Sequence, residues 1–500
     1  MRYGVLTLGI ASALASCSGG SDSEDTSVGA AAQDRSAAVA AAATANEVRE
    51  TIERFRNRSG GSTTTLPPAA AKDPGARDTT GDAGGPLPGL TAAQLYAFNV
   101  GKDDFNEAEE PADGLGPTFN LNSCGGCHAQ PAIGGTSPKV NPQVAMANGA
   151  NTLPSFITID GPVREARFVR NGDGSPDGGV HGLFTITGRP GAETCKIAQP
   201  DFARELGRNN VIFRIPTPVF GAGLIEAIAD SEILRNQALA ASTKQALGIG
   251  GRPNMLLSGS LITGIPNRNG NDGTIGRFGH KAQNKSLLIF AGEAYNVEMG
   301  ITNLAFPTER DETDGCVDLA PLPNSEATLE PAGGTPFPAV DGLSSIEKFT
   351  LFMRLLAPPV PSNAVAGATV ASITSGRQVF SDVGCALCHT PSMRTYAKAS
   401  TPAMANQSAN LFSDLLLHDM GQGLADGIQQ GQAGGRDFRT APLWGLGQRL
   451  FFLHDGRTSD LVQAIRAHYS DGSEANAVTQ RFFNLPGARQ QDALNFLRSL

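Results

Sequence analysis

The chain has 500 residues, of which 40% are hydrophobic, so it is long enough for two domains that each bury a core. Its formal net charge of −9 argues against a nucleic-acid partner, which needs clustered lysines and arginines; a basic partner would be better matched. Because 60 glycines and 32 prolines accompany only 6% aromatic residues, the composition predicts many turns and long loops.

The N-terminus has the form of a bacterial lipoprotein signal peptide, residues 1–17. A short apolar run over residues 5–15 leads into a lipobox-like end at Cys17, which would become the acylated first residue. Such a run is too short to cross a hydrocarbon layer of roughly 30 Å. We therefore expect a periplasmic protein with a lipid anchor, in the outer membrane because Ser18 rather than Asp follows the cysteine. A signal peptide cut elsewhere and a buried helix are the alternatives.

Residues 18–89 are rich in Ala, Ser, Thr, Gly and Asp, which leaves too little apolar surface to offset the entropy of ordering. This composition predicts a disordered tether. Ordered structure should begin near residue 90, where Ala92, Leu95 and Phe98 recur at three-residue steps along one face of a helix.

A second helical start lies at residue 345, where Phe349, Phe352 and Met353 have helical spacing and Pro358 stops the helix. A further helix is expected over residues 375–384, and the chain ends in a helix that contains Leu494, Phe496 and Leu497. The order of helix, cysteine motif and loops thus occurs twice, which places a domain boundary at 340/341.

Two short motifs carry the chemistry, Cys124-Gly-Gly-Cys127-His128 and Cys385-Ala-Leu-Cys388-His389. Each fits the attachment pattern of haem c, in which two thiols bond the vinyl groups and the adjacent histidine binds iron. A zinc site or a thioredoxin-like redox pair is the alternative, but neither motif has the second CxxC or the HxxxH that tetrahedral zinc needs. The motifs predict two covalently bound haem c groups.

Seven cysteines are present, and the haem motifs and the lipobox account for five of them. In an oxidising periplasm the remaining two, Cys195 and Cys316, are expected to form a disulfide that stabilises the fold by about 3 to 5 kcal/mol. Two free buried thiols are the alternative.

The segment from Asn171 to Asp177 alternates oxygen-bearing side chains, with Asp173 and Ser175 between its ends, as a Ca2+ loop does. The bidentate Glu expected at position twelve is missing. A polar turn is therefore favoured over a calcium site.

Several blocks resemble the family of bacterial di-haem oxidoreductases related to cytochrome c peroxidases and to the di-haem enzymes that mature methylamine dehydrogenase. The blocks are Phe119-Asn-Leu-Asn-Ser-Cys-Gly-Gly-Cys-His, Arg277-Phe-Gly-His-Lys-Ala, Glu298-Met-Gly-Ile-Thr, Leu417-His-Asp-Met-Gly, Phe438-Arg-Thr-Ala-Pro-Leu-Trp-Gly-Leu and Phe452-Leu-His-Asp-Gly-Arg. The resemblance runs from about residue 90 to residue 500. It implies a mainly α fold of two cytochrome c-like domains with long irregular loops and insertions, an N-terminal haem c domain at 90–340 and a C-terminal one at 341–500.

In the related peroxidases the N-terminal haem reacts with peroxide and the C-terminal haem takes up electrons, so the resemblance assigns His128 to the reactive iron and His389 to the transfer iron. The distal ligand of the second peroxidase haem is a Met fourteen residues after the His of an HDG motif. Here the residue fourteen after His454 is His468, which predicts bis-histidine ligation and a lower potential. A histidine that is simply buried in the core is the alternative.

The related peroxidases carry a distal acid–base carboxylate in a block that Glu298 matches, and such a group can move a proton between the two oxygens of peroxide. The alternative is a solvated surface Glu. Twenty residues earlier those enzymes have a Trp that bridges the haems, where this chain has Phe278; its only Trp is Trp444. His280 stands where family members often show Trp, which makes it a distal ligand, a proton relay or a packed substitute.

Other polar residues are candidates for supporting roles. His418 and His454 lie in HD pairs that would bond haem propionates or hold loops, and Arg439 and Arg457 are plausible propionate partners because guanidinium binds carboxylate bidentately. His181 could be a sixth ligand of the first haem.

The resemblance implies an oxidoreductase that passes electrons from the second haem to the first and reduces hydrogen peroxide or another small oxidant, with a small c-type cytochrome as donor. A non-catalytic electron carrier is one alternative, in which His181 or His280 closes the first iron. Oxidation of a protein or an organic substrate by a high-valent iron is the other.

Overall fold

The computed structural model describes residues 66–77, 83–256, 274–303, 305–308, 315–316, 340, 342–399 and 401–500. The proposed acylation site Cys17, the signal peptide and the first part of the tether lie outside these residues. No helix among the described residues is long and apolar enough to cross a membrane.

Twelve α-helices occur in the described part of the chain. They are α2 (Ala92–Asn106), α3 (Cys124–Cys127), α4 (Phe202–Gly207), α5 (Ala222–Glu226), α6 (Asp230–Ala238), α7 (Ala241–Ala246), α8 (Leu287–Met299), α10 (Ser345–Leu355), α11 (Val370–Val383), α12 (Leu461–Ala467), α13 (Asn476–Phe483) and α14 (Gly487–Ser499). Short 3-10 turns, among them η4 (Cys385–Leu387), connect some of them.

Eleven short strands accompany the helices. They are β1 (Thr118–Phe119), β2 (Glu165–Phe168), β3 (Val180–His181), β4 (Phe184–Thr185), β5 (Val211–Arg214), β6 (Met255–Leu256), β7 (Thr274–Ile275), β8 (Met393–Arg394), β9 (Ser408–Ala409), β10 (Leu417–Asp419) and β11 (Asp437–Arg439). All pair antiparallel, in one sheet of order β3-β2-β5 and four two-stranded ones. The expectation of a mainly α fold therefore holds only in part, because the long glycine- and proline-rich connections fold into short ribbons. The division into two cytochrome c-like domains stays a prediction.

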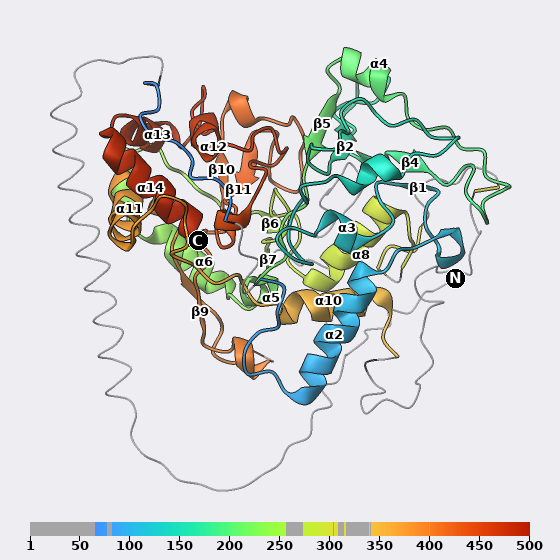
Figure 1. Cartoon of the computed structure of the whole chain (residues 1–500), viewed down its shortest axis with the longest axis horizontal. Helices are drawn as coiled ribbons and strands as arrows, with labels where there is room; N and C mark the ends of the chain where they lie inside the picture. Colours follow the sequence, from blue (N-terminus) through green and yellow to red (C-terminus); the bar gives the residue numbers. More distant parts are fainter. Residues whose placement is uncertain are drawn as a thin grey trace, which may run out of the picture.

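The first core forms around α2, α8 and α10, at one end of the molecule (Figure 1). Phe352 of α10 packs against Phe98 and Phe105 of α2, with ring centroids 5.4 and 5.0 Å apart. The two helices come close because α2 has Gly101 at their crossing, where a Cβ would lie 2.3 Å from the carbonyl oxygen of Lys348. This packing places the end of α2 beside the first cysteine motif.

Helix α2 occurs where the spacing of apolar residues predicts it, but it buries a different face. Leu95 is 43% exposed, whereas Ala97, Phe98, Gly101 and Phe105 are buried. Steps of three residues drift around a helix that has 3.6 residues per turn, so the contact stripe follows steps of three and four instead. The prediction that Ala92 and Leu95 face the core together with Phe98 is therefore wrong.

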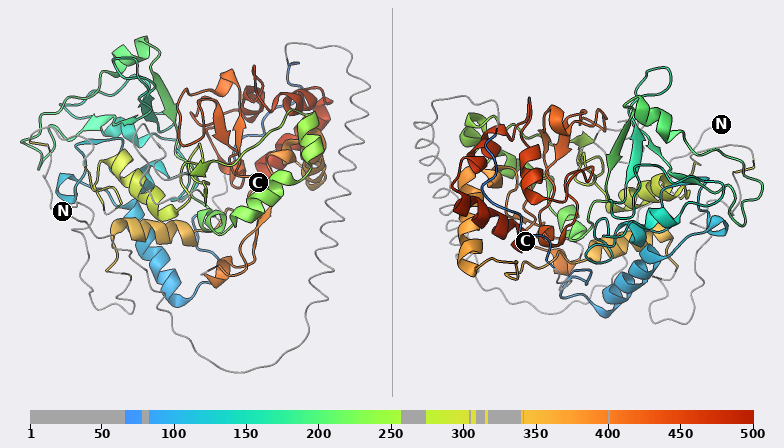
Figure 2. Two further views of the ribbon diagram at one scale, coloured as in Figure 1. Left: turned by 180° about the vertical axis from the view of Figure 1, so that it is seen from behind. Right: turned by 45° about the horizontal axis from the view of Figure 1, so that its top comes forward.

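The second core lies at the opposite end and contains α11, α13 and α14, which Figure 2 shows from behind. Leu494, Phe496 and Leu497 are buried on α14, as the terminal pattern predicts. Helix α11 includes residues 375–384 except the last, Gly384, which caps it in the left-handed conformation at φ 105°. The second cysteine motif begins at the residue that follows this cap, Cys385.

The predicted tether takes part in the fold from residue 66 onward. Leu66, Ala69 and Ala71 pack against the second core, and Asp73 forms a 2.6 Å ion pair with Arg498. Arg498 is only 1% exposed, so its buried guanidinium depends on this carboxylate. A composition poor in apolar residues does not reveal such a polar contact, which is why residues 66–77 differ from the expectation.

Helix α10 belongs to the first core, although the division at 340/341 places it in the second half of the chain. Phe349, Phe352 and Met353 are buried as their spacing predicts, against α2 and α8. The chain therefore crosses between the two cores more than once.

Cys195 and Cys316 form the predicted disulfide, which links the loop before α4 to the segment that follows α8. Both cysteines are buried in the first core. The alternative of two free thiols is wrong.

Replacing Gly376 by Ala tests the helix crossing that supports the second motif. A Cβ there would lie 1.9 Å from the carbonyl oxygen of Asp492 on α14, so the helices must separate, and we expect destabilisation of about 3 kcal/mol. Thermal unfolding of the haem-loaded protein measures it. Gly207 on α4 is the control, since a Cβ there meets nothing within 4 Å and Ala should change stability by less than about 1 kcal/mol. Equal unfolding temperatures for the two variants would contradict this packing.

Candidate functional site

The first cysteine motif forms a single turn, α3. Ser123 caps it by accepting a hydrogen bond from the backbone N–H of Gly126 at 3.4 Å, and His128 follows as the C-cap. The Nδ1 of His128 lies 3.0 Å from the carbonyl oxygen of Gly135. A carbonyl only accepts, so Nδ1 carries the proton and Nε2 is the nitrogen that can bind a metal.

The second motif has the same arrangement on a different scaffold. It begins in η4, directly after Gly384, and the Nδ1 of His389 donates to the carbonyl oxygen of Phe412 at 3.0 Å. Burial lowers the pKa of both motif histidines to about 4. Both are therefore neutral at physiological pH, which is the form that binds metals.

A cavity of about 280 Å³ adjoins the second motif and is lined largely by apolar side chains. Cys385, Cys388, His389 and His468 all line it. His468 ends α12, and its Nδ1 donates to the carbonyl oxygen of Ala464 at 2.8 Å, which again leaves Nε2 as the possible ligand atom. A positive charge on His468 would lower the pKa of His389, so the two rings are near one another. The structure thus brings together the two histidines that the sequence pairs as axial ligands.

Two arginines, Arg439 and Arg449, also line this cavity. Neither has a carboxylate partner among the described residues; Arg439 donates from Nε to the carbonyl oxygen of Gly279 at 2.9 Å. Burial lowers the pKa of each to about 10. Cations that line a largely apolar cavity are normally paired, so this cavity suits an anionic group.

Arg457, the other predicted propionate partner, lies elsewhere. Its guanidinium is 40% exposed and pairs with Asp455 at 2.6 Å, and it does not line either cavity. Sequence reasoning missed Arg449, because no motif marks it.

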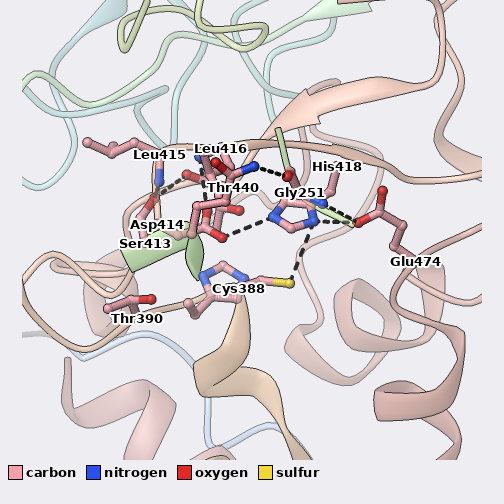
Figure 3. Close-up of polar contacts among 12 residues, drawn as sticks. Gly251, Cys388, Thr390, Ser413, Asp414, Leu415, Leu416, His418, Thr440 and Glu474 are labelled. Carbon is pink, nitrogen blue, oxygen red and sulfur yellow. Dashed lines mark hydrogen bonds and ion pairs between the residues drawn. The ribbon is translucent and has the colours of Figure 1, made fainter. Parts of the chain in front are cut away.

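His418 is fixed between two carboxylates beside Cys388 (Figure 3). Its Nε2 lies 3.1 Å from Asp414 and its Nδ1 lies 2.6 Å from Glu474. Burial opposes the charged ring, but Cys388 and Asp414 raise the pKa of His418 well above its usual value. The carboxylate of Glu474 also accepts from the N–H of Gly251 at 3.1 Å, so this cluster holds loops together.

Cys388, Asp414 and His418 also lie close enough to one another to hold a metal ion. A metal ion is not needed to explain this arrangement. Cys388 belongs to the second motif, and both ring nitrogens of His418 already contact the carboxylates of Asp414 and Glu474. His418 therefore holds loops, one of the two roles expected of the HD pairs.

A second cavity, of about 160 Å³, adjoins the first motif and has three carboxyl groups in its wall. Its walls include Cys124, Cys127 and His128 together with the carboxylates of Glu165, Glu293 and Glu298. Asn120, four residues before the motif, donates from Nδ2 to Glu298 at 2.8 Å. The backbone N–H of Asn120 also donates to the carbonyl oxygen of Glu298 at 2.8 Å. The candidate acid–base residue is thus tied directly to the segment that leads into the motif.

Burial raises the pKa of Glu298 well above its usual value, and the neighbouring carboxylate of Glu165 raises it further. Burial also opposes ionisation of Glu165, but Arg167 lowers the pKa of Glu165 to about 2. The two neighbouring carboxyl groups therefore differ in protonation: the raised pKa favours the protonated form of Glu298, and the lowered pKa favours the ionised form of Glu165. The alternative that Glu298 is a solvated surface residue does not fit its position in the cavity wall.

The two cavities share a wall of four residues, Ile215, Pro216, Thr217 and His280. The Nε2 of His280 donates to the carbonyl oxygen of Ile215 at 3.0 Å, and the N–H of Ile215 donates to the carbonyl oxygen of His454 at 2.8 Å. Burial and the charge of Arg214 lower the pKa of His280 to about 3, so its ring is neutral.

Two other candidates, Phe278 and His181, lie outside the walls of both cavities. Phe278 lines neither and stacks on Phe290, with ring centroids 6.1 Å apart, so the residue between the cavities is His280. His181 stacks on Phe168 at 3.7 Å and pairs with Asp177 at 3.0 Å.

In the predicted Ca2+ loop, Asp173 accepts from the backbone N–H and the hydroxyl of Ser175 at 2.9 and 2.6 Å. Asn171 donates from Nδ2 to the hydroxyl of Ser175 at 3.1 Å. The loop therefore bonds to itself as a polar turn does.

Residues 185–500 match the sequence model of the family described as "di-haem oxidoreductase, putative peroxidase". The chain belongs to this family. No curated protein matches the chain at a significant level. Membership implies two haem groups, and the two cavities fit them: each has a CxxCH motif in its wall, and the second adds two partly buried cations that suit propionates.

Replacing Arg449 by Met tests which arginines hold the anionic edge of the second haem. Loss of the guanidinium would leave a buried anion without its partner, and we expect the haem-loaded protein to lose about 3 kcal/mol of stability. Arg457→Met is the matched control: this exposed pair should contribute less than about 1 kcal/mol. Denaturant unfolding followed through haem absorption measures both. A larger loss in the Arg457 variant would reverse the assignment.

Proposed function

We propose that this protein is a periplasmic di-haem c-type enzyme that reduces hydrogen peroxide with electrons received at its C-terminal haem. The observation that carries the proposal is the chemical difference between the two cavities. The second contains an additional histidine, His468, whereas the first contains the carboxyl groups of Glu165, Glu293 and Glu298. An iron with two fixed axial ligands suits electron transfer. An iron that faces acid–base groups suits a reaction that moves protons on a bound substrate.

The motif cysteines support covalent attachment at both sites. Cys124 and Cys127 line the first cavity together with His128, and Cys385 and Cys388 line the second together with His389. None of the four forms a disulfide, so all four thiols are available for thioether bonds.

His468 would complete the coordination of the second haem. Its ring is neutral because burial lowers its pKa, and the helical carbonyl of Ala464 fixes its tautomer. Two imidazole ligands would give this haem a lower potential than a His/Met pair, which suits an electron entry point.

Glu298 would be the acid–base group of the first haem. When bound, the haem supplies the iron that exchanges electrons and binds peroxide. Reduction of H2O2 by two electrons and two protons to two water molecules also requires moving a proton from the inner to the outer oxygen. A carboxyl group that is protonated at neutral pH and faces the cavity can donate that proton.

His280 and the segment from Ile215 to Thr217 would separate the two haems and connect them. They are the residues that line both cavities, and hydrogen bonds join His280 to Ile215 and Ile215 to His454. This wall offers a short route for electrons from the second site to the first, in the place for which the sequence pointed to Phe278.

A non-catalytic electron carrier would need a second ligand in the first cavity. His181 is bonded outside it, and the ring of His280 is fixed to the carbonyl of Ile215. The carboxyl groups of the first cavity therefore favour the enzyme.

The acidic chain suits a small, basic c-type cytochrome as electron donor. Acylation at Cys17 would attach the protein to the outer membrane and keep it in the periplasm, which the disulfide between Cys195 and Cys316 supports.

His468→Ala tests the ligation of the second haem. Without the imidazole, the low-spin absorption spectrum of that haem should change to a high-spin one, and its potential should change as well. His181→Ala is the control, because this histidine lies outside both cavities and should leave the spectra as they are. An unchanged spectrum in the His468 variant would exclude bis-histidine ligation.

Glu298→Gln tests the peroxide reaction. The amide cannot exchange a proton with peroxide, so the rate of reaction should fall by about 100- to 10,000-fold while both haem spectra stay intact. Stopped-flow mixing with hydrogen peroxide measures the rate. Glu293→Gln, which removes a carboxyl group of the same cavity that is bonded to Asn284, should slow the reaction far less. A fully active Glu298 variant would remove this residue from the mechanism.

A further inference from the structure

The first cavity contains a second carboxyl group that the family-based assignments do not include. Glu165 begins β2, and its carboxyl group lies beside that of Glu298 in the wall of the first cavity, close enough for the two groups to share a hydrogen bond. Both line the cavity. The two residues come from distant parts of the chain, strand β2 and the last turn of α8.

Strand geometry explains why Glu165 faces the cavity beside cations. Residues two apart on a strand point to the same face, so Glu165 and Arg167 lie together, and the Nε of Arg167 donates to Oε1 of Glu165. The β2–β5 register places Arg214 directly opposite Glu165. All three side chains line the first cavity.

The cations around this pair are themselves fixed. Arg167 donates from Nη1 to the carbonyl oxygen of Gly178 at 3.0 Å, and Arg214 pairs with Asp426 at 2.7 Å. Neither can swing away from Glu165 without breaking these contacts. Asn120 holds Glu298 from the other side, by the 2.8 Å hydrogen bond from its Nδ2.

We propose that Glu165 and Glu298 act as one proton-sharing pair, in which Glu165 is the ionised member that accepts and Glu298 the protonated member that donates. This inference rests on the proposed role of Glu298 toward peroxide. Glu165 would then be a further catalytic residue, because it shares a hydrogen bond with the carboxyl group of Glu298.

A pair of carboxyl groups can supply an acid and a base at the same time, which a single carboxyl group cannot. Peroxide cleavage needs an acid for the outer oxygen and a base for the proton of the inner oxygen at the same pH. Burial and the mutual repulsion of the carboxylates keep a proton on Glu298, while Arg167 keeps Glu165 ionised. One proton leaves the pair for the outer oxygen and one returns from the inner oxygen, so its proton count is restored.

Infrared spectroscopy of the haem-loaded protein tests the shared proton directly. A buried protonated carboxyl group has a carbonyl stretching band that shifts in D2O, and the band attributed to the pair should be present in the wild type. Glu109 and Glu293 have pKa values of about 7 and contribute bands of their own, so the band of the pair is identified as the one that Glu298→Gln removes.

Three substitutions give the pair a distinctive signature. The band should be lost in Glu298→Gln and equally in Glu165→Gln, because Glu298 without its carboxylate neighbour lies beside the charges of Arg167 and Arg214 and ionises. It should remain in Glu293→Gln, which removes a carboxyl group of the same cavity that is bonded to Asn284. A band that persists in Glu165→Gln, or that is missing from the wild type, would overturn the proposal.

Glu165→Asp covers the case in which Glu165→Gln leaves Arg167 unpaired and does not fold. It keeps a negative charge beside Arg167 but shortens the side chain by one methylene, so the hydrogen bond to Glu298 changes and the band should shift in frequency. An unshifted band would contradict the pair.

The infrared band and the peroxide rate can fail separately. The band reports only whether the two carboxyl groups share a proton, whereas the rate of Glu298→Gln reports whether that proton is used on peroxide. A band that needs both residues, together with an unaffected peroxide rate, would refute the proposed function and leave the shared proton established.

Discussion

The buried carboxylate of Asp426 holds together the wall between the two cavities. It pairs with Arg214 at 2.7 Å and with Lys281 at 3.0 Å, and all three side chains are almost fully buried. Arg214 directly precedes Ile215, and Lys281 directly follows His280, so one carboxylate fixes both chain segments of the wall. Removing one member of such a buried cluster typically costs about 3 to 5 kcal/mol, because the remaining charges lose their partners.

The same cluster links the wall to the chemistry on either side. Arg214 extends toward Glu165 in the first cavity, across the β2–β5 register. Lys281 lies 4.1 Å from the ring centroid of Phe438, which stacks on His454 beside the second cavity. The distance between the two sites, the charge around Glu165 and the orientation of His280 therefore depend on one buried arrangement. The two helical cores at the ends of the molecule hold the motifs, and this polar centre determines how the motifs face one another.

The sequence predicts the parts of the site that local patterns encode. Motif spacing identifies His128 and His389, and the fourteen-residue interval identifies His468, which the structure places in the same cavity as His389. The disulfide between Cys195 and Cys316 follows from counting the remaining cysteines. Helices α10, α11 and α14 follow from apolar periodicity. Each of these features depends on residues close together in the chain or on a small set of possible partners.

The rest depends on contacts between distant segments that carry no local signal. Glu165 is an ordinary strand residue until the short sheet places it against Glu298, and Arg449 belongs to no motif. Phe278 and His280 are only two residues apart, but the ring of Phe278 packs in the first core and the ring of His280 lies in the wall that the two cavities share. The spacing carried over from the related peroxidases selects Phe278, whereas the structure places His280, two residues later, in the wall of both cavities. Strand β2 thus brings a further carboxyl group, that of Glu165, into the first cavity, and no local pattern in the sequence marks it.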